Sequence, residues 1–326
     1  MLLAAQERPY AGAQACRGCH PGEFRLQSAS GHARSLSTAQ GHPLAEKFTP
    51  RAPFTRKPNF RFEFSRQLTV RIHDEEAVVE VPIEWAFGAG EQAVTFVSRV
   101  NAEFYLEHYL SYYAALGTLA PTPGQDAIQP KSLAEAPGLL YKTLDQNTGI
   151  LGCFECHSTG PVAVAAGNVL TPAEPGVHCE ACHGPGGTHV KTGGKSAVQN
   201  PARMSAAELN SFCGRCHRPP AGDAARIDWN YAWNVRHQPV YLSQSRCFQK
   251  SKGALSCLSC HAAHEPLRTR DAAYYNQRCA SCHTVAPGKP PNCVDCHMPR
   301  VAPQPPLRFT NHWIGVYGEG AKLKPR

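Results

Sequence analysis

The chain has 326 residues, of which 42% are hydrophobic, so it could form one large domain or two of ordinary size. Its 28 prolines and 27 glycines interrupt the sequence too often for long regular helices or strands. The formal net charge is +8, but the lysines and arginines are scattered rather than gathered in one stripe, which argues against a nucleic-acid-binding protein.

The cysteines follow one strict pattern. Of the 15 cysteines, all but Cys247 form seven Cys-x-x-Cys pairs, and a histidine follows the second cysteine of every pair. We number these motifs 1 to 7 in chain order. Their cysteines are Cys16, Cys19, Cys153, Cys156, Cys179, Cys182, Cys213, Cys216, Cys257, Cys260, Cys279, Cys282, Cys293 and Cys296. Their histidines are His20, His157, His183, His217, His261, His283 and His297.

The histidine after each pair decides what the motifs bind. A disulfide framework, a zinc site or a thiol oxidoreductase would explain paired cysteines, but none of these needs a histidine at the next position. Covalent heme attachment needs the whole motif, because two thioether bonds fix one porphyrin edge and the adjacent imidazole binds the iron. The sequence therefore predicts seven covalently attached c-type hemes.

The N-terminus and the heme motifs bear on where the protein works. Residues 1–5 resemble the end of a signal peptide but lack its basic and long apolar regions, so we interpret them as a signal-peptide remnant. No segment approaches about 18 uninterrupted apolar residues, so no transmembrane helix is predicted. Because heme is attached in this way outside the inner membrane, we expect an exported protein, periplasmic or extracellular.

Three further segments are expected along the chain. Residues 6–58 form an N-terminal heme segment around motif 1. Residues 59–120 form a β-rich unit, because 60–64 and 68–72 alternate apolar and polar residues and later stretches are rich in β-branched residues. Those later stretches are 78–83 and 93–100, whereas the aromatic run 104–119 fits either a helix or a strand.

Residues 121–326 are expected to form a hexaheme C-terminal region. Six motifs follow one another between Cys153 and His297, too densely for a conventional core. We predict short helices at 206–213 and 272–279 that carry attachment cysteines. The predicted fold class is a multiheme cytochrome c, with mostly short α-helices and loops around stacked hemes and a small antiparallel β unit inserted after the first motif.

Histidines outside the motifs supply candidates for the distal side of each iron. Nine remain, and the chain has only three methionines, so the sequence favours bis-histidine irons. We expect His178, His189 and His264 to be distal ligands, followed by His32, His237 and His312.

The seventh distal ligand stays open at this point. Either His108 or His42 completes the set, or one iron lacks a distal ligand and could bind substrate, whereas His73 falls in a predicted solvent-facing hairpin. Cys247 is either an inert thiol or, less expectedly, a sulfur ligand or catalytic thiol.

Several segments resemble a known family. Residues 176–189, with Gly-Val-His-Cys-Glu-Ala-Cys-His-Gly-Pro-Gly and His189, resemble the tetraheme cytochrome c of ammonia oxidisers and its larger relatives. Residues 236–239, 245–247, 257–264, and 16–20 with His32, look like other parts of the same pattern. The resemblance implies electron transfer through closely stacked hemes, with His32, His178 and His189 among the distal ligands.

We therefore expect an electron-transfer protein with a redox protein as donor and another as acceptor, free or in an oligomer or membrane-associated complex. The main alternative is an oxidoreductase that acts on a small nitrogen or sulfur compound at one five-coordinate heme. Related nitrite reductases use a motif that ends in lysine, and no motif here does so. A further alternative is a structural role in a conductive filament or surface complex.

Overall fold

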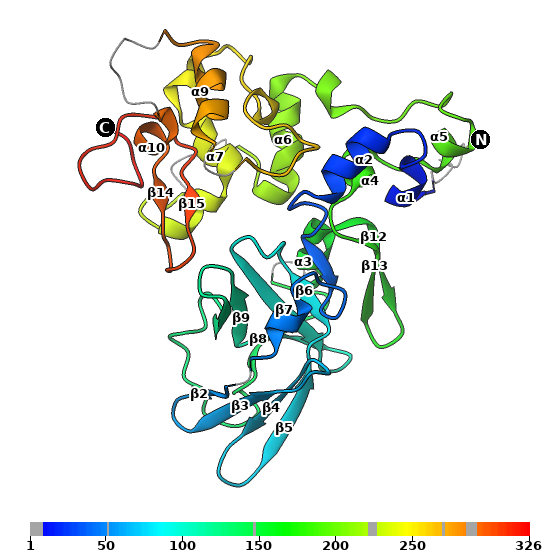
Figure 1. Cartoon of the computed structure of the whole chain (residues 1–326), viewed down its shortest axis with the longest axis vertical. Helices are drawn as coiled ribbons and strands as arrows, with labels where there is room; N and C mark the ends of the chain where they lie inside the picture. The colour runs from blue at the N-terminus through cyan, green and yellow to red at the C-terminus, as the bar shows by residue number, and fades with distance from the viewer. Residues whose placement is uncertain (1–8, 51, 146–147, 221–226, 269–270, 285–291) are drawn as a thin grey trace. The chain divides into compact units, whose positions relative to one another are not determined.

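The computed structural model describes residues 9–50, 52–145, 148–220, 227–268, 271–284 and 292–326. They form two compact units, the first ending at Gln199 and the second beginning at Asn200 (Figure 1). The signal-peptide remnant expected at residues 1–5 lies outside the described residues. The domain boundaries expected from the sequence rest on motif spacing rather than on contacts, and they stay a prediction. No helix among the described residues is long and apolar enough to cross a membrane.

The helices of the first unit are short and gather around motifs 1 to 3. They are α1 (Ala13–Cys16), α2 (Pro21–Ser28), the 3-10 helix η1 (Ala45–Phe48), α3 (Leu151–His157), α4 (Cys179–His183) and α5 (Gly187–Lys191). Proline at the first position of α2 suits a helix start, because its missing N–H would have no partner there.

The strands of the first unit pair antiparallel throughout. The seven-stranded sheet has the order β1-β6-β7-β8-β11, with β9 pairing β7 and β10. It consists of β1 (Leu36–Thr38), β6 (Trp85–Phe87), β7 (Ala93–Arg99), β8 (Phe104–His108), β9 (Leu110–Tyr113), β10 (Thr118–Pro121) and β11 (Gly138–Lys142). The four-stranded sheet consists of β2 (Phe54–Arg56), β3 (Phe60–Phe64), β4 (Thr69–His73) and β5 (Val78–Pro82), and β12 (Ser158–Ala165) pairs with β13 (Val169–Pro175) as a hairpin.

The second unit is mostly helical. It contains η2 (Pro201–Arg203), α6 (Ala206–His217), η4 (Ala232–Arg236), α7 (Gln238–Ser243), α8 (Arg246–Lys250), η5 (Cys257–Ser259), α9 (Ala272–Ala280), α10 (Cys293–His297) and the strand pair β14 (Arg300–Val301) and β15 (Phe309–Thr310). Ser205 and Glu208 form a capping box at the start of α6, and the Asp271 side chain caps α9. The two helices predicted in this region are confirmed.

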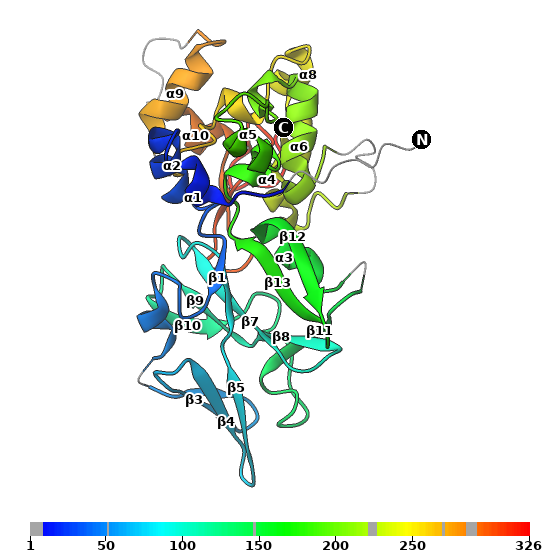
Figure 2. The same ribbon diagram turned by 90° about the vertical axis from the view of Figure 1, so that its right-hand side faces the viewer.

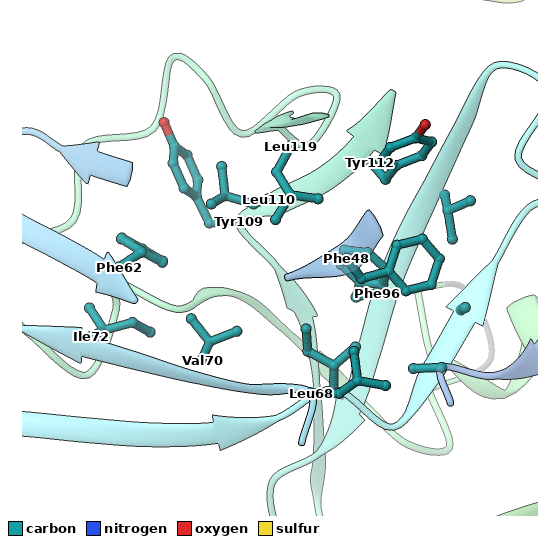
Figure 3. Close-up of a cluster of buried hydrophobic side chains, with 14 of the residues drawn as sticks. Phe48, Phe62, Leu68, Val70, Ile72, Phe96, Tyr109, Leu110, Tyr112 and Leu119 are labelled. Carbon is teal, nitrogen blue, oxygen red and sulfur yellow. The ribbon is translucent and has the colours of Figure 1, made fainter. Parts of the chain in front are cut away.

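The first unit holds most of the buried hydrophobic side chains of the described residues. Its larger core joins the four-stranded sheet to β7, β9 and β10, with Phe48 packed edge-on against Phe96 at 4.7 Å between ring centroids (Figure 3). A second core around Tyr105 and Phe154 fixes α3 to the seven-stranded sheet. The β unit is therefore a self-sufficient scaffold for motif 2.

The β content is larger than the sequence predicted. Residues 60–64, 68–72, 78–83 and 93–100 do form strands, but the antiparallel structure also includes β1, β11 and the hairpin β12–β13 in the region predicted to be helical and heme-filled. The ambiguous run 104–119 forms β8, β9 and β10. The expectation of mostly short helices thus fits the second unit, whereas the first unit holds much more β structure than the single small unit predicted after the first motif (Figure 2).

One candidate ligand, His108, belongs to the β core. The Nε2 atom of His108 lies 2.8 Å from the Ser98 hydroxyl, and burial lowers the pKa of His108 to about 4. Unfolding restores the ordinary value of 6.5, so at lower pH the unfolded chain binds a proton that the folded chain excludes. The buried neutral imidazole therefore contributes stability above pH 6.5 that is lost as pH falls toward 4.

We predict that the free energy of unfolding of the first unit falls by roughly 3 kcal/mol through His108 between pH 6.5 and 4, because the pKa difference multiplies the energy of one pKa unit. Denaturant titrations across this range, followed by circular dichroism, measure it. His108→Gln should flatten the pH dependence, and His73→Gln on the four-stranded sheet is the matched control. An equal slope in the His108→Gln variant would contradict the assignment.

Candidate heme sites

Each heme-binding histidine is reached through one turn of helix. The amide of His20 donates to the Cys16 carbonyl at 2.9 Å, and the same bond joins His261 to Cys257 at 3.0 Å and His283 to Cys279 at 2.9 Å. A bond of this kind, four residues apart, places the histidine one turn after the first cysteine of its motif. The spacing of the motif is therefore that of a single helical turn.

Six motifs lie in pairs that meet at their first cysteines. The thiols of Cys16 and Cys179 hydrogen-bond to one another, which joins motif 1 to motif 3. The same contact joins Cys213 to Cys257, from motifs 4 and 5, and Cys279 to Cys293, from motifs 6 and 7. The elements that carry them also touch pairwise, α1 with α4, α6 with η5 and α9 with α10. Motif 2 stands outside these pairs.

Two asparagines hold the pairs of the second unit together. The Asn210 side chain on α6 accepts from the Cys257 amide at 3.0 Å and donates to the Leu255 carbonyl at 3.1 Å. On α9, the Asn276 side chain accepts from the Cys293 amide at 3.0 Å. Each asparagine stands three residues before the first cysteine of its own motif, so Asn-x-x-Cys-x-x-Cys-His is a sequence signal that our sequence analysis missed.

A buried carboxylate does the corresponding work for motifs 1 and 3. Glu180, between the two cysteines of motif 3, is 4% exposed. Its carboxylate accepts from the amides of Ala11 at 2.9 Å, Gly12 at 2.8 Å and Gly186 at 2.6 Å. Backbone amides compensate for the burial of the charge, and they tie the segment before motif 1 to α4. A glutamate inside a motif is ordinary in sequence, so nothing predicted this role.

Motif 2 is attached to the β unit instead. Phe154, between its two cysteines, is fully buried and meets Trp85 and Phe87 edge-on at 5.3 and 5.1 Å between ring centroids. His157 follows the second cysteine directly, and its Nδ1 donates to the Ser35 carbonyl at 3.1 Å. The sheet thereby fixes both the helix and the imidazole of motif 2.

The same orienting bond recurs at five histidines. Nδ1 donates to a backbone carbonyl in each, which leaves Nε2 as the unprotonated nitrogen that can bind a metal. The pairs are His157 with Ser35 at 3.1 Å, His183 with Gln199 at 2.9 Å, His189 with Ser196 at 2.6 Å, His297 with Gly315 at 2.8 Å and His312 with Thr310 at 3.0 Å. Histidines of the motifs and histidines outside them thus make the same hydrogen bond through Nδ1.

Two pairs of imidazoles face one another at the separation that a metal needs. The ring centroids of His20 and His189 are 6.4 Å apart with planes 21° from parallel, and those of His261 and His312 are 6.2 Å apart at 36°. Imidazoles that bind one ion from opposite sides, each with its nitrogen about 2 Å from the metal, have centroids roughly 6 Å apart. The residues therefore fit iron with two axial histidines.

The segments of His32 and His178 lie against motif 2. The His32 carbonyl accepts from the Val177 amide at 2.9 Å, and the Gly176 amide donates to the His157 carbonyl at 3.1 Å. Gly176 has φ +88°, and a Cβ there would lie 2.2 Å from the Ala33 carbonyl oxygen, so the close approach requires glycine. Nε2 of His178 donates to the Pro175 carbonyl at 3.0 Å, and its buried Nδ1 has no hydrogen-bond partner. Nδ1 is therefore the nitrogen that His178 offers to a metal.

The remaining candidate distal ligands lie in different environments. Burial, and then the charges of Arg218 and Arg236, lower the pKa of His237 to about 4, which keeps the imidazole neutral as metal binding requires. His264 lies three residues after His261 of motif 5 and stays a predicted distal ligand. The structure places His42 and His108 in the first unit's β region, where both ring nitrogens of His42 and the Nε2 atom of His108 have partners in the protein.

The thiol environments differ from motif to motif. Burial raises the pKa of Cys16 to about 12 and that of Cys153 to about 11, whereas the hydrogen bond with Cys257 lowers the pKa of Cys213 to about 7. In the part of the chain that the structure describes, no three histidine, cysteine or acidic side chains converge as a metal site would need. The donor set suits thioether bonds and pairs of imidazoles.

Comparisons with known proteins agree with this chemistry. Residues 128–184 match the family model described as cytochrome c554 and c-prime. Over 168 residues the chain is 29% identical to the multiheme cytochrome MtrA of Shewanella baltica (strain OS185), a match that covers 48% of this chain and 42% of that protein. The chain is therefore similar to multiheme c-type cytochromes. Its alignment thus spans less than half the length of that curated relative.

One solved structure shows a fold similar to that of this chain. The crystal structure of the outer cell wall cytochrome OcwA superposes with a TM-score of 0.53 at 17% identity, covering 94% of this chain and 79% of that one. The undecaheme cytochrome from the S-layer of Carboxydothermus ferrireducens gives a TM-score of 0.44 at 17% identity, over 85% of this chain and 43% of that one. The specific likeness to the tetraheme cytochrome of ammonia oxidisers stays a prediction.

We predict that Asn210→Ala and Asn276→Ala each lower the free energy of unfolding of the second unit of the cytochrome by about 1–3 kcal/mol, because each leaves a cysteine amide without its acceptor. Denaturant titration of the purified heme protein measures this. Asn230→Ala, at an exposed position of the same unit, is the control and should change it by less than about 0.5 kcal/mol. Equal stability of all three variants would remove the proposed role.

Proposed function

We propose that the protein is an exported electron carrier that holds seven covalently bound hemes, most of them with two axial histidines. The observation that carries this proposal is the pairing of motifs at their first cysteines, Cys16 with Cys179, Cys213 with Cys257 and Cys279 with Cys293. Two thioether attachments so close together bring two porphyrin edges close together, as a relay between hemes requires.

The protein residues do three things for this function. Cysteines of each motif fix one porphyrin edge, and Phe154, Glu180, Asn210 and Asn276 fix the segments that carry those cysteines. Backbone carbonyls orient the imidazoles so that Nε2 is the ligand nitrogen. Heme iron, when bound, supplies reversible one-electron chemistry, and two imidazole ligands favour a lower potential than histidine with methionine would.

The proposed axial pairs follow the facing imidazoles. His189 completes the iron of motif 1, opposite His20, and His312 completes the iron of motif 5, opposite His261. His32, His178, His237 and His264 are proposed for other irons.

The proposed location is periplasmic or extracellular, with redox proteins as donor and acceptor. Heme attachment to this motif takes place outside the inner membrane. The structural neighbour OcwA is an outer cell wall cytochrome, which supports a location outside the inner membrane for this chain. An oligomer or a membrane-associated complex stays a proposal.

A second candidate function is oxidation or reduction of a small nitrogen or sulfur compound at one iron that lacks a distal histidine. The observation that favours it is the hydrogen bonding of His42, whose Nε2 donates to the Gly88 carbonyl at 3.1 Å while Nδ1 accepts from the Leu44 amide at 3.0 Å. Both ring nitrogens are engaged, so this histidine does not complete the set.

We predict that intact-protein mass spectrometry of the exported protein shows the mass of seven hemes added to the polypeptide. Each double substitution of a motif, such as Cys293→Ala with Cys296→Ala, should remove one heme because both thioether bonds are lost. Cys247→Ala, outside the motifs, is the control and should leave all seven in place. Fewer than seven hemes in the unaltered chain would overturn the proposed count.

We predict that His189→Met raises one midpoint potential in a spectroelectrochemical titration, by on the order of 0.1 V, because a thioether ligand stabilises ferrous iron relative to a second imidazole. His73→Met, on the four-stranded sheet, should leave every potential unchanged. A titration curve of His189→Met that coincides with that of the unaltered protein would exclude His189 as an axial ligand.

A further inference from the structure

The number of histidines outside the motifs that can reach an iron decides whether every heme has a distal histidine. Seven of the chain's 16 histidines belong to the motifs, so nine remain for seven irons. Whether nine suffice depends on how many of them can reach a metal with a free ring nitrogen. Three of the nine lie in the β structure of the first unit. His42 and His108 are hydrogen-bonded there, whereas Nε2 of His73 has no hydrogen-bond partner and His73 is set aside by its position.

His42 is committed through both nitrogens. Its ring is 3% exposed and packs against Phe48 at 5.1 Å between centroids. The bonds to the Gly88 carbonyl and from the Leu44 amide hold the loop between η1 and the strands. Binding an iron would break one of these buried bonds and leave its partner unsatisfied.

His108 faces away from the nearest motif. Side chains alternate along a strand, so Tyr105 and Glu107 on β8 share one face and His108 occupies the other. Tyr105 packs against Phe154 of motif 2, and the Glu107 carboxylate influences the pKa of Cys153 in the same motif. His108 instead bonds to Ser98 and meets Phe96 edge-on at 6.4 Å. Its imidazole belongs to the interior of the β unit.

His73 belongs to a sheet that carries no motif. It lies on β4, and its Nε2 is 3.6 Å from a carboxylate oxygen of Glu63 on the neighbouring β3. Residues 54–82, which form this four-stranded sheet, contain no cysteine. Within the first unit, Figures 1 and 2 show this sheet at the end opposite α1, α2 and α4.

Six histidines are then left for seven irons, and their distribution locates the deficit. The first unit has motifs 1 to 3 and three remaining histidines, His32, His178 and His189. The second unit has four motifs but three such histidines, His237, His264 and His312. His20 and His189 both lie in the first unit, and His261 and His312 both lie in the second. When each iron takes its distal histidine from its own unit in this way, the second unit has one histidine too few for its four motifs.

We propose that one iron of the second unit, at motif 4, 6 or 7, has no distal histidine from this chain and binds small exogenous ligands with a lone pair, such as carbon monoxide, nitric oxide or nitrite. Motif 5 is excluded because His312 faces His261. This inference rests on the proposed heme binding and deepens the second candidate function. Cys247, the one cysteine outside the motifs, is tested as a ligand by the Cys247→Ala variant.

Carbon monoxide titration of the reduced seven-heme protein tests the proposal. We expect one molecule bound per chain, and a high-spin ferric signal that integrates to one heme in the electron paramagnetic resonance spectrum of the oxidised protein. His237→Gln, His264→Gln and His312→Gln should each raise the stoichiometry from one to two, because each opens another iron. His42→Gln and His108→Gln should leave it at one, and they are the matched controls.

The outcomes separate the two proposals. A mass below seven hemes overturns the proposed function itself. Seven hemes with no bound carbon monoxide, or with two or more, overturns the inference while leaving the electron carrier intact. A stoichiometry that rises in His42→Gln, His108→Gln or Cys247→Ala identifies that residue as the ligand and likewise overturns it. Removing motif 4, 6 or 7 by double cysteine-to-alanine substitution should abolish binding in one of the three variants.

Discussion

The bond from a histidine Nδ1 to a backbone carbonyl is the interaction on which the heme sites depend. It fixes the tautomer of the imidazole and presents Nε2 as the metal ligand. His157 and His297 from motifs, and His189 and His312 from outside them, all make it. A carbonyl is available for this bond wherever the backbone leaves regular structure, so the loops rich in proline and glycine serve the sites directly. Short helices interrupted by such loops are therefore what the ligation requires.

The two units reach stability in different ways. The first unit has its own hydrophobic core between β-sheets, and motif 2 is fixed to it through Phe154. The second unit has a small cluster around Val235, Tyr241 and Val301, together with tryptophan side chains at its edge. Four heme motifs share that unit, so the macrocycles must supply most of its apolar contacts. This difference explains why strands dominate one unit and short helices the other.

The sequence predicted the chemistry better than the architecture. Seven identical motifs leave little freedom, because covalent attachment ties residue type and spacing to one cofactor. Alternation along 60–64 and 68–72 predicted strands correctly, whereas the hairpin β12–β13 was missed because Pro161 and Pro172 lie inside it. Glu180 and Asn210 were missed because their roles depend on which motifs lie side by side, and such long-range contacts leave no mark in local sequence patterns. The repeated Asn-x-x-Cys spacing was readable, but its meaning required the structure.

The C-terminal segment links the two motif pairs of the second unit. The Thr310 carbonyl orients His312, which faces His261 of motif 5, and the Gly315 carbonyl orients His297 of motif 7. Between them, Ser245 holds the segment, since its hydroxyl donates to the His312 carbonyl at 3.1 Å and accepts from the Ile314 amide at 2.7 Å. Residues 310–315 therefore contact both motif pairs. A shift of this segment would move His312, which faces His261 of motif 5, together with the Gly315 carbonyl that orients His297 of motif 7. The pairs held by Asn210 and Asn276 are thus repeated modules, and residues 310–315 connect one to the other.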